Sequence, residues 1–253
     1  MKKKIFFVFF ISFASFVYAY LPINLVDTPT VETLPKGSYS IYLSSYEKGG
    51  IKLKVIVGLS DLFQLGISED IGGLIGDDKV SLNIPGALIK FNILRSEEGK
   101  KSLGWSVGYD YFIEGEYGKT NVKVKDAEGR NVLRREIIYG LYSVWNLPFH
   151  LIGPGQNFSF GCRYPLLPWN MKKDFNNLTF FAGLDIPFNR EFRVVCEIEE
   201  ISLNFTDFSR VMLNAGFRYV AGDLLGVSFN FRYIPDQNKL SRLIVIEYQN
   251  FLF

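Results

Sequence analysis

The chain has little of what most metal and catalytic centres require. It contains a single histidine, His150, and two cysteines, Cys162 and Cys196. A zinc site needs about four ligands, drawn mainly from these residue types, so we expect none here. The glycines within 72–76 lack the Lys-Ser/Thr pair of a phosphate-binding loop and are read as turn residues. The sequence therefore predicts no metal and no cofactor.

Long apolar runs are also missing after the first 17 residues, although hydrophobic residues make up 48% of the chain. A membrane-spanning helix needs about 20 consecutive apolar residues, so we do not expect a helical membrane protein. Aromatic residues make up 16% of the chain, mostly Phe and Tyr. Such residues favour strands and form the aromatic girdles of membrane β-barrels.

An excess of charge of one sign is absent as well. The chain has 28 basic and 26 acidic residues, and three of the basic ones are Lys2, Lys3 and Lys4. Without these three lysines, 25 basic residues face 26 acidic ones. Nucleic-acid-binding domains carry a clear basic excess, so no nucleic-acid partner is expected.

The N-terminus has the pattern of an exported protein. The three lysines precede an apolar run at 5–17, and small residues then allow cleavage after Ala19. The alternative is an uncleaved anchor, but the run is too short to span a membrane comfortably as a helix. We expect a signal peptide at 1–19, an extended periplasmic lead-in segment with three prolines at 20–36, and a barrel at 37–253.

Segments of about ten residues with alternating polarity recur from residue 37 to the end of the chain. In one of them Phe229 and Phe231 share a face, while Asn230 and Arg232 share the other. This period of two is that of β-strands, and strands of this length between turns are typical of membrane barrels. The expected strands are 37–46, 50–58, 61–70, 80–93, 102–114, 136–146, 156–164, 177–187, 191–202, 209–220, 224–234 and 241–253. Pro85 interrupts the fourth, of which 86–93 is the secure part.

A soluble β-sandwich would alternate in the same way with its apolar face inward. Three details favour a lipid-facing barrel instead: Gly and Ser repeat on the polar faces, aromatic residues such as Trp105 and Tyr219 lie near strand ends, and the chain ends in a strand closed by Phe253. Twelve is an even number, as single-chain bacterial barrels require. We expect an all-β, antiparallel up-and-down transmembrane β-barrel of about twelve strands in the bacterial outer membrane.

The last strand departs from simple alternation. Phe251 and Phe253 fall on the face of Glu247, opposite Ile246 and Tyr248. We therefore expect either a bulge near residue 250 or the departure of the last three residues from the sheet.

Charged residues on the polar faces are expected to point into the lumen. They are Lys52, Lys54, Lys90, Asp110, Arg163, Asp185, Arg193, Glu197, Glu199, Arg218 and Arg232. Facing lipid at the bilayer midplane, an Arg or Lys would cost about 2–4 kcal/mol. One interpretation is a narrow channel for small polar solutes or ions, whose charges bias permeation. The other is a plugged, salt-bridged interior in a structural or surface-interaction barrel that binds a cell-surface polysaccharide or a partner protein.

An enzyme is the least favoured reading. Outer-membrane lipid hydrolases use Ser and His near the outer leaflet, whereas His150 lies in a connection expected in the periplasm. Carboxylates at Glu197, Glu199 and Glu200 are of the kind that binds Ca²⁺. The alternation instead places the first two in the lumen and Glu200 near the external rim.

The connection 115–135 is expected to be external. Its stretches 121–125 and 131–133 flank Ala127-Glu128-Gly129, which predicts a hairpin reaching outward. Its basic residues make it a candidate contact for anionic surface sugars. The other expected partners are outer-membrane lipid, lipopolysaccharide and the barrel-assembly machinery.

The two cysteines are expected to be unpaired despite export. Cys162 and Cys196 fall on apolar faces of strands that the strand 177–187 separates. Second-neighbour strands lie at least about 9 Å apart, beyond the reach of a disulfide.

Short stretches along the chain resemble a group of uncharacterised bacterial outer-membrane barrel proteins. They are Thr28-Pro29-Thr30, Leu34-Pro35-Lys36-Gly37-Ser38-Tyr39, Gly49-Gly50, Gly58-Leu59, Leu65-Gly66, Ile84-Pro85, Phe181-Ala182-Gly183-Leu184-Asp185 and Asn214-Ala215-Gly216-Phe217-Arg218-Tyr219. The chain is also similar to larger barrel proteins linked with exopolysaccharide export. The resemblance implies the fold and the location, and no functional residue is carried over from it.

Overall fold

The computed structural model describes most of the chain after the N-terminal stretch. The described residues are 22–46, 49–76, 80–82, 85–95, 103–113, 123–125, 131–133, 137–149, 155–165, 178–202, 211–235 and 238–252. No helix among them is long and apolar enough to cross a membrane. The signal peptide expected at 1–19 and His150 lie outside the described residues.

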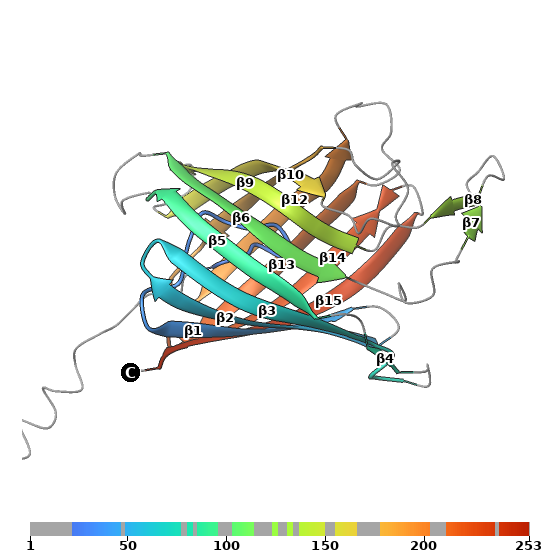
Figure 1. Cartoon of the computed structure of the whole chain (residues 1–253), viewed down its shortest axis with the longest axis horizontal. Helices are drawn as coiled ribbons and strands as arrows, with labels where there is room; N and C mark the ends of the chain where they lie inside the picture. The colour runs from blue at the N-terminus through green and yellow to red at the C-terminus, as the bar shows by residue number, and fades with distance from the viewer. Residues whose placement is uncertain are drawn as a thin grey trace, which may run out of the picture.

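Twelve antiparallel strands form a closed barrel (Figure 1). They are β1 (Ser38–Tyr46), β2 (Gly50–Ser60), β3 (Phe63–Gly72), β5 (Gly86–Leu94), β6 (Gly104–Ile113), β9 (Ile137–Phe149), β10 (Gln156–Pro165), β11 (Thr179–Pro187), β12 (Phe192–Ser202), β13 (Met212–Ala221), β14 (Leu225–Ile234) and β15 (Lys239–Phe251). Each pairs with its neighbours along the chain, and β1 pairs with both β2 and β15 to close the ring. The twelve-stranded up-and-down barrel predicted from the alternation is confirmed.

Three short strands lie outside this ring. β4 (Ser81–Leu82) extends the edge of β3, and Pro85 separates it from β5, as the interrupted fourth segment predicted. β7 (Lys123–Lys125) pairs with β8 (Asn131–Leu133) in the hairpin expected within the connection 115–135. Figure 1 shows this hairpin beyond one end of the barrel.

The last strand continues in register to its end. Ser38 of β1 lies opposite Phe251 of β15, and no register shift interrupts that pairing. The backbone N–H of Leu252 donates to the carbonyl oxygen of Gly37 at 2.8 Å. The expected bulge is not found in this pairing, and Phe251 stays in the sheet through its pairing with β1, whereas Phe253 lies outside the described residues.

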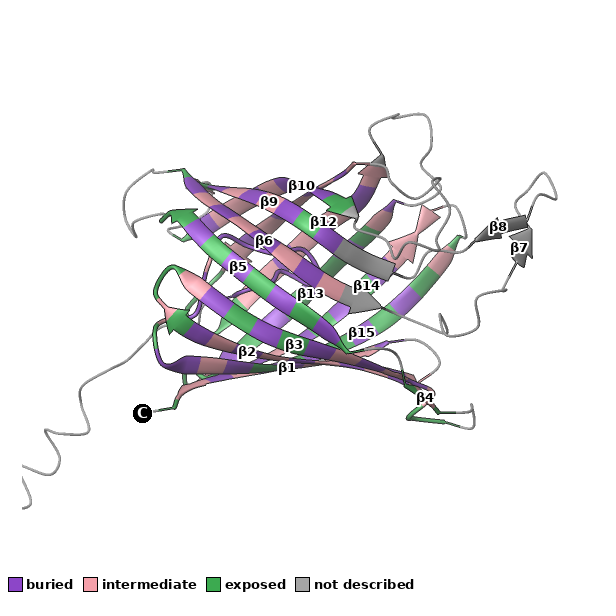
Figure 2. Ribbon diagram, viewed as in Figure 1, coloured by how far each residue is buried: buried purple, intermediate pink, exposed green. Residues whose placement is uncertain are grey.

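The barrel wall is apolar outside and polar inside. Exposed and buried residues alternate along the strands, as the stripes of Figure 2 show. Large apolar side chains such as Ile67, Phe217 and Phe229 are among the most exposed. Because burying such groups away from water is favourable, an outer face of this kind fits a lipid environment. This inside-out alternation excludes the soluble sandwich.

Aromatic pairs gather at the end of the barrel where β1 begins. Phe63 and Phe91 stack with ring centroids 4.4 Å apart, and Phe192 lies 5.0 Å from Tyr219. Each pair joins neighbouring strands, β3 with β5 and β12 with β13. Such a belt of aromatic residues is typical of the membrane interface.

Cys162 and Cys196 are free and partly exposed. They lie on β10 and β12, and β11 runs between these two strands. The expected separation of the two thiols by a strand is therefore found.

The main departure from expectation is the segment 22–36, called the plug below. Residues 20–36 were expected to form an extended lead-in outside the barrel. Residues 22–36 instead fold back inside it, and Ile23, Leu25 and Leu34 are almost fully buried (Figure 1). Eight strands enclose an interior that side chains alone can fill. The wider ring of twelve leaves space, and the plug occupies it.

Candidate functional site: the plugged lumen

The plug begins with a tight turn held by its own backbone. The N–H of Leu25 donates to the Thr28 carbonyl oxygen, and that of Thr30 donates to the Ile23 carbonyl oxygen, both at 3.0 Å. Asn24 and Pro29 form an antiparallel bridge between these bonds. The turn therefore presents residues 26–28 at its tip, with backbone N–H groups free to bond the barrel wall.

Glu197 on β12 receives that tip. Its carboxylate accepts the backbone N–H groups of Val26 and Asp27, both at 3.0 Å, and that of Thr28 at 3.2 Å. The Thr28 hydroxyl donates at 2.7 Å and Asn214 Nδ2 at 2.6 Å. Buried carboxylates are costly unless hydrogen-bonded, and bonds to an ionised acceptor are about twice as strong as neutral ones. Glu197 is thus satisfied largely by the plug.

Asp27 pairs with cations of the wall on β2 and β14. Its Oδ1 accepts from Lys52 Nζ at 3.1 Å, and its Oδ2 pairs with the guanidinium of Arg232. Burial alone would raise the pKa of the Asp27 carboxyl, but Lys52, Arg232 and Lys54 outweigh that effect and hold this pKa well below its usual range. The carboxylate is therefore charged at every physiological pH.

Wall side chains also donate hydrogen bonds to main-chain carbonyl oxygens of the turn. The guanidinium of Arg218 donates to the carbonyl oxygens of Asn24, at 3.1 Å, and Leu25, and its Nε donates to Ser228 Oγ at 3.0 Å. The hydroxyl of Tyr42 donates to the Val26 carbonyl oxygen at 3.0 Å. Arg218 is 1% exposed and Tyr42 is 2% exposed. These hydrogen bonds between the wall and the turn are therefore shielded from water.

The second half of the plug is held by neutral and main-chain groups. Val31 offers its carbonyl oxygen to Asn92 Nδ2 at 3.1 Å and to Ser106 Oγ at 2.6 Å. The N–H of Leu34 donates to Gln64 Oε1 at 2.8 Å. Two charged residues of the wall also take part. Lys90 Nζ donates to the carbonyl oxygen of Glu32 at 2.8 Å and to that of Ile23 at 3.3 Å, and Asp61 Oδ1 accepts from the N–H of Lys36 at 2.9 Å.

Apolar side chains of the plug pack into three clusters on the wall. Leu25 and Val26 join Tyr46, Val195 and Leu243. A second cluster combines Ile23, Leu34, Ile56 and Leu88, and a third combines Val31, Tyr142, Val144 and Phe181. Every cluster contains at least one plug residue and at least two wall residues. Apolar burial, which stabilises by about 25 cal/mol per Å², is therefore distributed along the whole segment.

Two wall glycines allow the plug to approach this closely. A Cβ at Gly58 would overlap the carbonyl oxygen of Pro35, and one at Gly183 would overlap the Cδ1 of Leu25. Larger residues at these positions would displace the plug or the strand. The wall is thus shaped to the plug as well as bonded to it.

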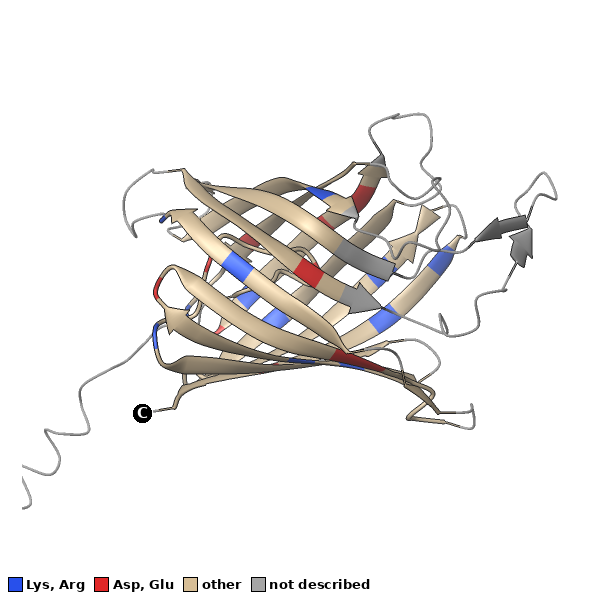
Figure 3. Ribbon diagram, in the orientation of Figure 1, with Lys and Arg blue, Asp and Glu red and all other residues tan. Residues whose placement is uncertain are grey.

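The lumen-facing charges expected from the alternation are mostly buried. Figure 3 marks the positions of the charged residues along the strands. The buried ones are Lys52, Lys54, Lys90, Asp110, Arg163, Asp185, Glu197, Glu199, Arg218 and Arg232. Arg193 is half-buried and pairs with Asp185 at 2.6 Å. Other wall pairs are Lys54 with Asp110 at 3.6 Å and Arg163 with Glu199 at 3.9 Å. Lys52, Lys90, Glu197, Arg218 and Arg232 contact the plug directly.

Sequence reasoning missed several residues of this interior. Asp70 and Glu247 are buried on their strands, and the alternation alone was sufficient to include them. Asp27 had no such signal, because its segment has neither a strand period nor a motif. Glu200 was expected near the rim, yet it is buried with a φ of 57°. A register shift between β11 and β12 at this point breaks the alternation.

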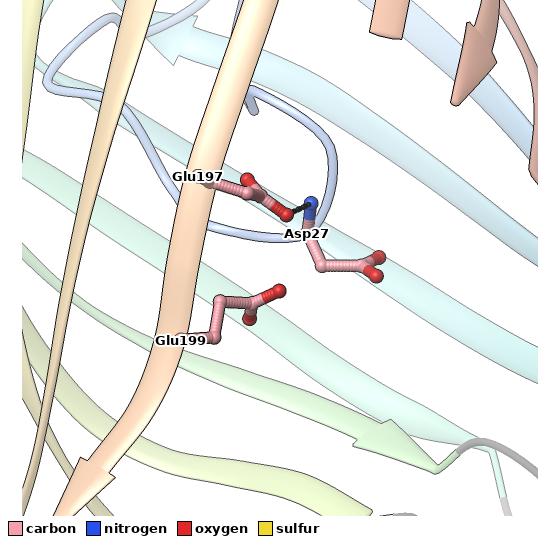
Figure 4. Close-up of side chains that lie close together, drawn as sticks. All are labelled: Asp27, Glu197 and Glu199. Carbon is pink, nitrogen blue, oxygen red and sulfur yellow. Dashed lines mark hydrogen bonds between the residues drawn. The ribbon is translucent and has the colours of Figure 1, made fainter. Parts of the chain in front are cut away.

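Three buried carboxylates approach one another in the middle of the site (Figure 4). Oxygen atoms of Asp27, Glu197 and Glu199 lie within 4.8 Å of one another. Asp27 pairs with Lys52 and Arg232, and Glu197 accepts the plug N–H groups. Glu199 accepts from Asn214 Nδ2 at 2.9 Å and lies 3.9 Å from the guanidinium of Arg163. Each carboxylate of the cluster thus has at least one cation or hydrogen-bond donor of the protein beside it.

A small pocket lies between the plug and the wall. A pocket of about 20 Å³ is bordered by Ile23 of the plug and by Lys54, Gln64, Lys90 and Tyr142 of the wall. This is room for about one water molecule. In this structure the plug and the wall side chains together fill the lumen at this level.

No family model matches the sequence, and no curated protein matches it. Among solved structures, the KdgM porin in complex with disordered oligogalacturonate aligns with a TM-score of 0.53 and 9% identity, over 83% of this chain and 98% of that one. The NanC porin aligns with a TM-score of 0.46 and 9% identity, over 85% and 100%. Omp33 of Acinetobacter baumannii aligns with a TM-score of 0.43 and 7% identity, over 85% and 97%. The likeness is one of fold: the chain has the β-barrel fold of outer-membrane porins.

Proposed function

We propose that the protein is a channel for small polar solutes or ions that the plug closes in the state described above. The observation that carries this proposal is the character of the wall beneath the plug. Charged and polar side chains line the barrel interior on all sides, including positions such as Asp185 and Arg193 that pair with each other and not with the plug. A wall of this kind can carry water and solutes once the space is free.

The size of the plug supports the same proposal. The fifteen residues 22–36 occupy the lumen, and none of the described strands passes through it. Withdrawal of residues 22–36 breaks no strand pairing, because β1 begins at Ser38. The barrel can therefore open without being unfolded. The porin fold of the KdgM structure agrees with this function, though at 9% identity it carries the fold alone.

The test is electrical. Purified full-length protein and a variant lacking residues 23–33 are compared in planar lipid bilayers. A variant lacking residues 120–130, an equally long deletion in the connection that bears the β7–β8 hairpin, is the matched control. We expect the 23–33 deletion alone to give frequent, stable conductance steps several times larger than those of the intact protein. A correctly folded 23–33 deletion that does not conduct contradicts the channel.

A second candidate is a structural or surface-interaction barrel whose lumen stays filled. The observation in its favour is how completely the plug is bound. The turn both donates and accepts hydrogen bonds with the wall, and its apolar side chains are buried. In that case the β7–β8 hairpin, which lies in a connection with many basic residues, would contact a surface polysaccharide or lipopolysaccharide. Loss of polysaccharide binding in the 120–130 deletion, with no conductance in the 23–33 deletion, is the result that favours this candidate.

Two further proposals concern maturation and chemistry. We propose that the chain is exported and that the mature protein begins at Tyr20, which N-terminal sequencing of the protein from outer membranes tests directly. We also propose that it is not an enzyme. The chain has one histidine, and the lumen groups are taken up by one another and by the plug.

A further inference from the structure

The turn at the tip of the plug is bound in the way that a small solute would be bound. Asp27 presents one carboxylate, and the two oxygens go to different cations, Lys52 on β2 and Arg232 on β14. Directly beside it, three N–H groups and one hydroxyl of residues 26–28 converge on the carboxylate of Glu197. The wall thus recognises a carboxylate and an adjacent set of hydrogen-bond donors at the same time.

The wall side of this arrangement is organised without the plug. Arg232 Nε donates to Asn214 Oδ1 at 3.1 Å, and Asn214 Nδ2 donates to Glu197 at 2.6 Å and to Glu199 at 2.9 Å. Asn214 therefore connects Arg232, which binds the Asp27 carboxylate, to Glu197, which accepts from the N–H groups of the turn. This link connects β12, β13 and β14 through side chains of the wall alone.

Removal of the turn would take from these buried groups the partners that the plug supplies. Lys52 is fully buried and the side chain of Arg232 is 5% exposed. Glu197 would lose the four plug donors that now satisfy it. A small molecule that carries both halves of the contact, a carboxylate and adjacent donors, can therefore compete with the turn for Lys52, Arg232 and Glu197.

We propose that residues 26–28 are an internal surrogate for a solute that carries a carboxylate beside hydrogen-bond donors, and that such a solute opens the barrel by competing with the plug at Lys52, Arg232 and Glu197. Two solute classes share this chemistry: sugar acids, whose donors are hydroxyls, and amino acids, whose donors are ammonium N–H groups. This inference rests on the proposed channel and names its solute class and the way it opens.

The test measures exposure of the plug in the full-length chain, independently of conductance. Val31 is 1% exposed and bonds the wall through its main-chain carbonyl, so Val31→Cys introduces a buried thiol that leaves the anchors intact. Cys162 and Cys196 are replaced by Ala in this background. The rate at which a small maleimide modifies the Cys at 31 then reports withdrawal of the plug.

We expect D-glucuronate and L-serine, each at millimolar concentration, to accelerate this labelling several-fold, and D-glucose to have no effect. Glucuronate acting alone assigns the site to sugar acids, and serine acting alone assigns it to amino acids. If neither probe exceeds glucose, the inference is overturned. The channel itself stands or falls separately, on the conductance of the 23–33 deletion.

A pair of variants distinguishes loss of the Asp27 contacts from a general loosening of the protein. Asp27→Asn removes the charge of the surrogate, and we expect it to accelerate labelling without any solute by about tenfold or more, because its buried cations lose their counter-ion. Asp223→Asn makes the same chemical change in the exposed turn pair with Arg190 and is expected to leave labelling unchanged. Equal labelling of the two variants would also overturn the inference.

Discussion

The two halves of the plug are bound by different physical means. The turn at 24–28 is anchored by charge: Glu197 accepts its N–H groups, Lys52 and Arg232 bind its carboxylate, and Arg218 donates to its carbonyls. The run at 30–34 is held mainly by neutral hydrogen bonds and apolar contacts, with Lys90 as its charged partner.

This difference indicates where opening begins. Charge-assisted bonds are few, directional and individually strong, so replacing one buried partner weakens the turn as a whole. Neutral hydrogen bonds contribute about 0.5–1.5 kcal/mol each, and losing one leaves the others in place. We therefore expect the turn to respond sharply to single substitutions and to competing ions, and the run to respond gradually.

The largest effect is expected from Glu197→Gln. The side chain keeps its size. In the variant, however, an amide NH₂ faces the N–H donors of residues 26–28, which in the intact protein bond to the carboxylate. Breaking one partner of a buried charged network costs about 3–5 kcal/mol. Hydrogen exchange measured by mass spectrometry should show loss of protection at residues 26–28 while the barrel strands remain protected. Unchanged protection there would contradict the anchoring role of Glu197.

A smaller, coupled effect is expected at the ion pair. Asp27→Asn and Arg232→Gln should each weaken protection of the turn, and the double variant should lose less than the sum of the two. Contacting charged residues show coupling of about 0.5–3 kcal/mol. The exchange-derived free energies of the four chains of this cycle give the coupling directly, and strict additivity would mean that the pair is not formed.

A substitution at the run 30–34 should have a smaller effect on protection. Ser106→Ala removes one of two donors to the Val31 carbonyl oxygen, and Asn92 keeps the other. We expect a cost of about 1 kcal/mol, seen as a modest rise in exchange near residue 31 with the turn at 26–28 unaffected. A loss as large as that of Glu197→Gln would remove the distinction between the halves.

The smallest effect is expected from mild acid. A carboxyl whose pKa is lowered on folding contributes stability that is present above its unfolded value and is lost as the pH falls through its folded value. For Asp27 the unfolded value is 3.8 and the folded one lies well below it. The Asp27 pairing should therefore be unaffected between pH 7 and pH 5. Weaker thermal stability of the Asp27→Asn variant relative to the intact chain should persist undiminished at both pH values.

Most of the barrel could be read from the sequence, because a period of two forces neighbouring side chains to opposite faces. Residues such as Arg218 and Arg232 could be placed inside on that basis alone. The alternation failed at Glu200, where the pairing of β11 with β12 shifts register. It also misjudged the last strand, since pairing with β1 rather than side-chain polarity determines the course of Phe251.

The plug could not be read in the same way. Three prolines made the segment look extended, and the partners of Asp27 and its neighbours lie on strands far along the chain. One signal was present: Ile23, Leu25 and Leu34 are apolar residues in a stretch assigned to water. Apolar side chains in a segment without a sheet face to join require some other place to be buried.

The sequence distance between the plug and its anchor has a consequence for the order of assembly. Val26 and Glu197 are 171 positions apart, and Arg232 lies farther still. The plug precedes every strand in the chain, and Lys52 lies on β2, yet the turn lacks Glu197, Arg218 and Arg232 until β12, β13 and β14 are in place. Contacts of such long range form late and slowly, because loop closure must come first. Any chain interrupted before β14 therefore keeps its N-terminal segment undocked, and accessibility of that segment to a protease distinguishes finished barrels from stalled ones.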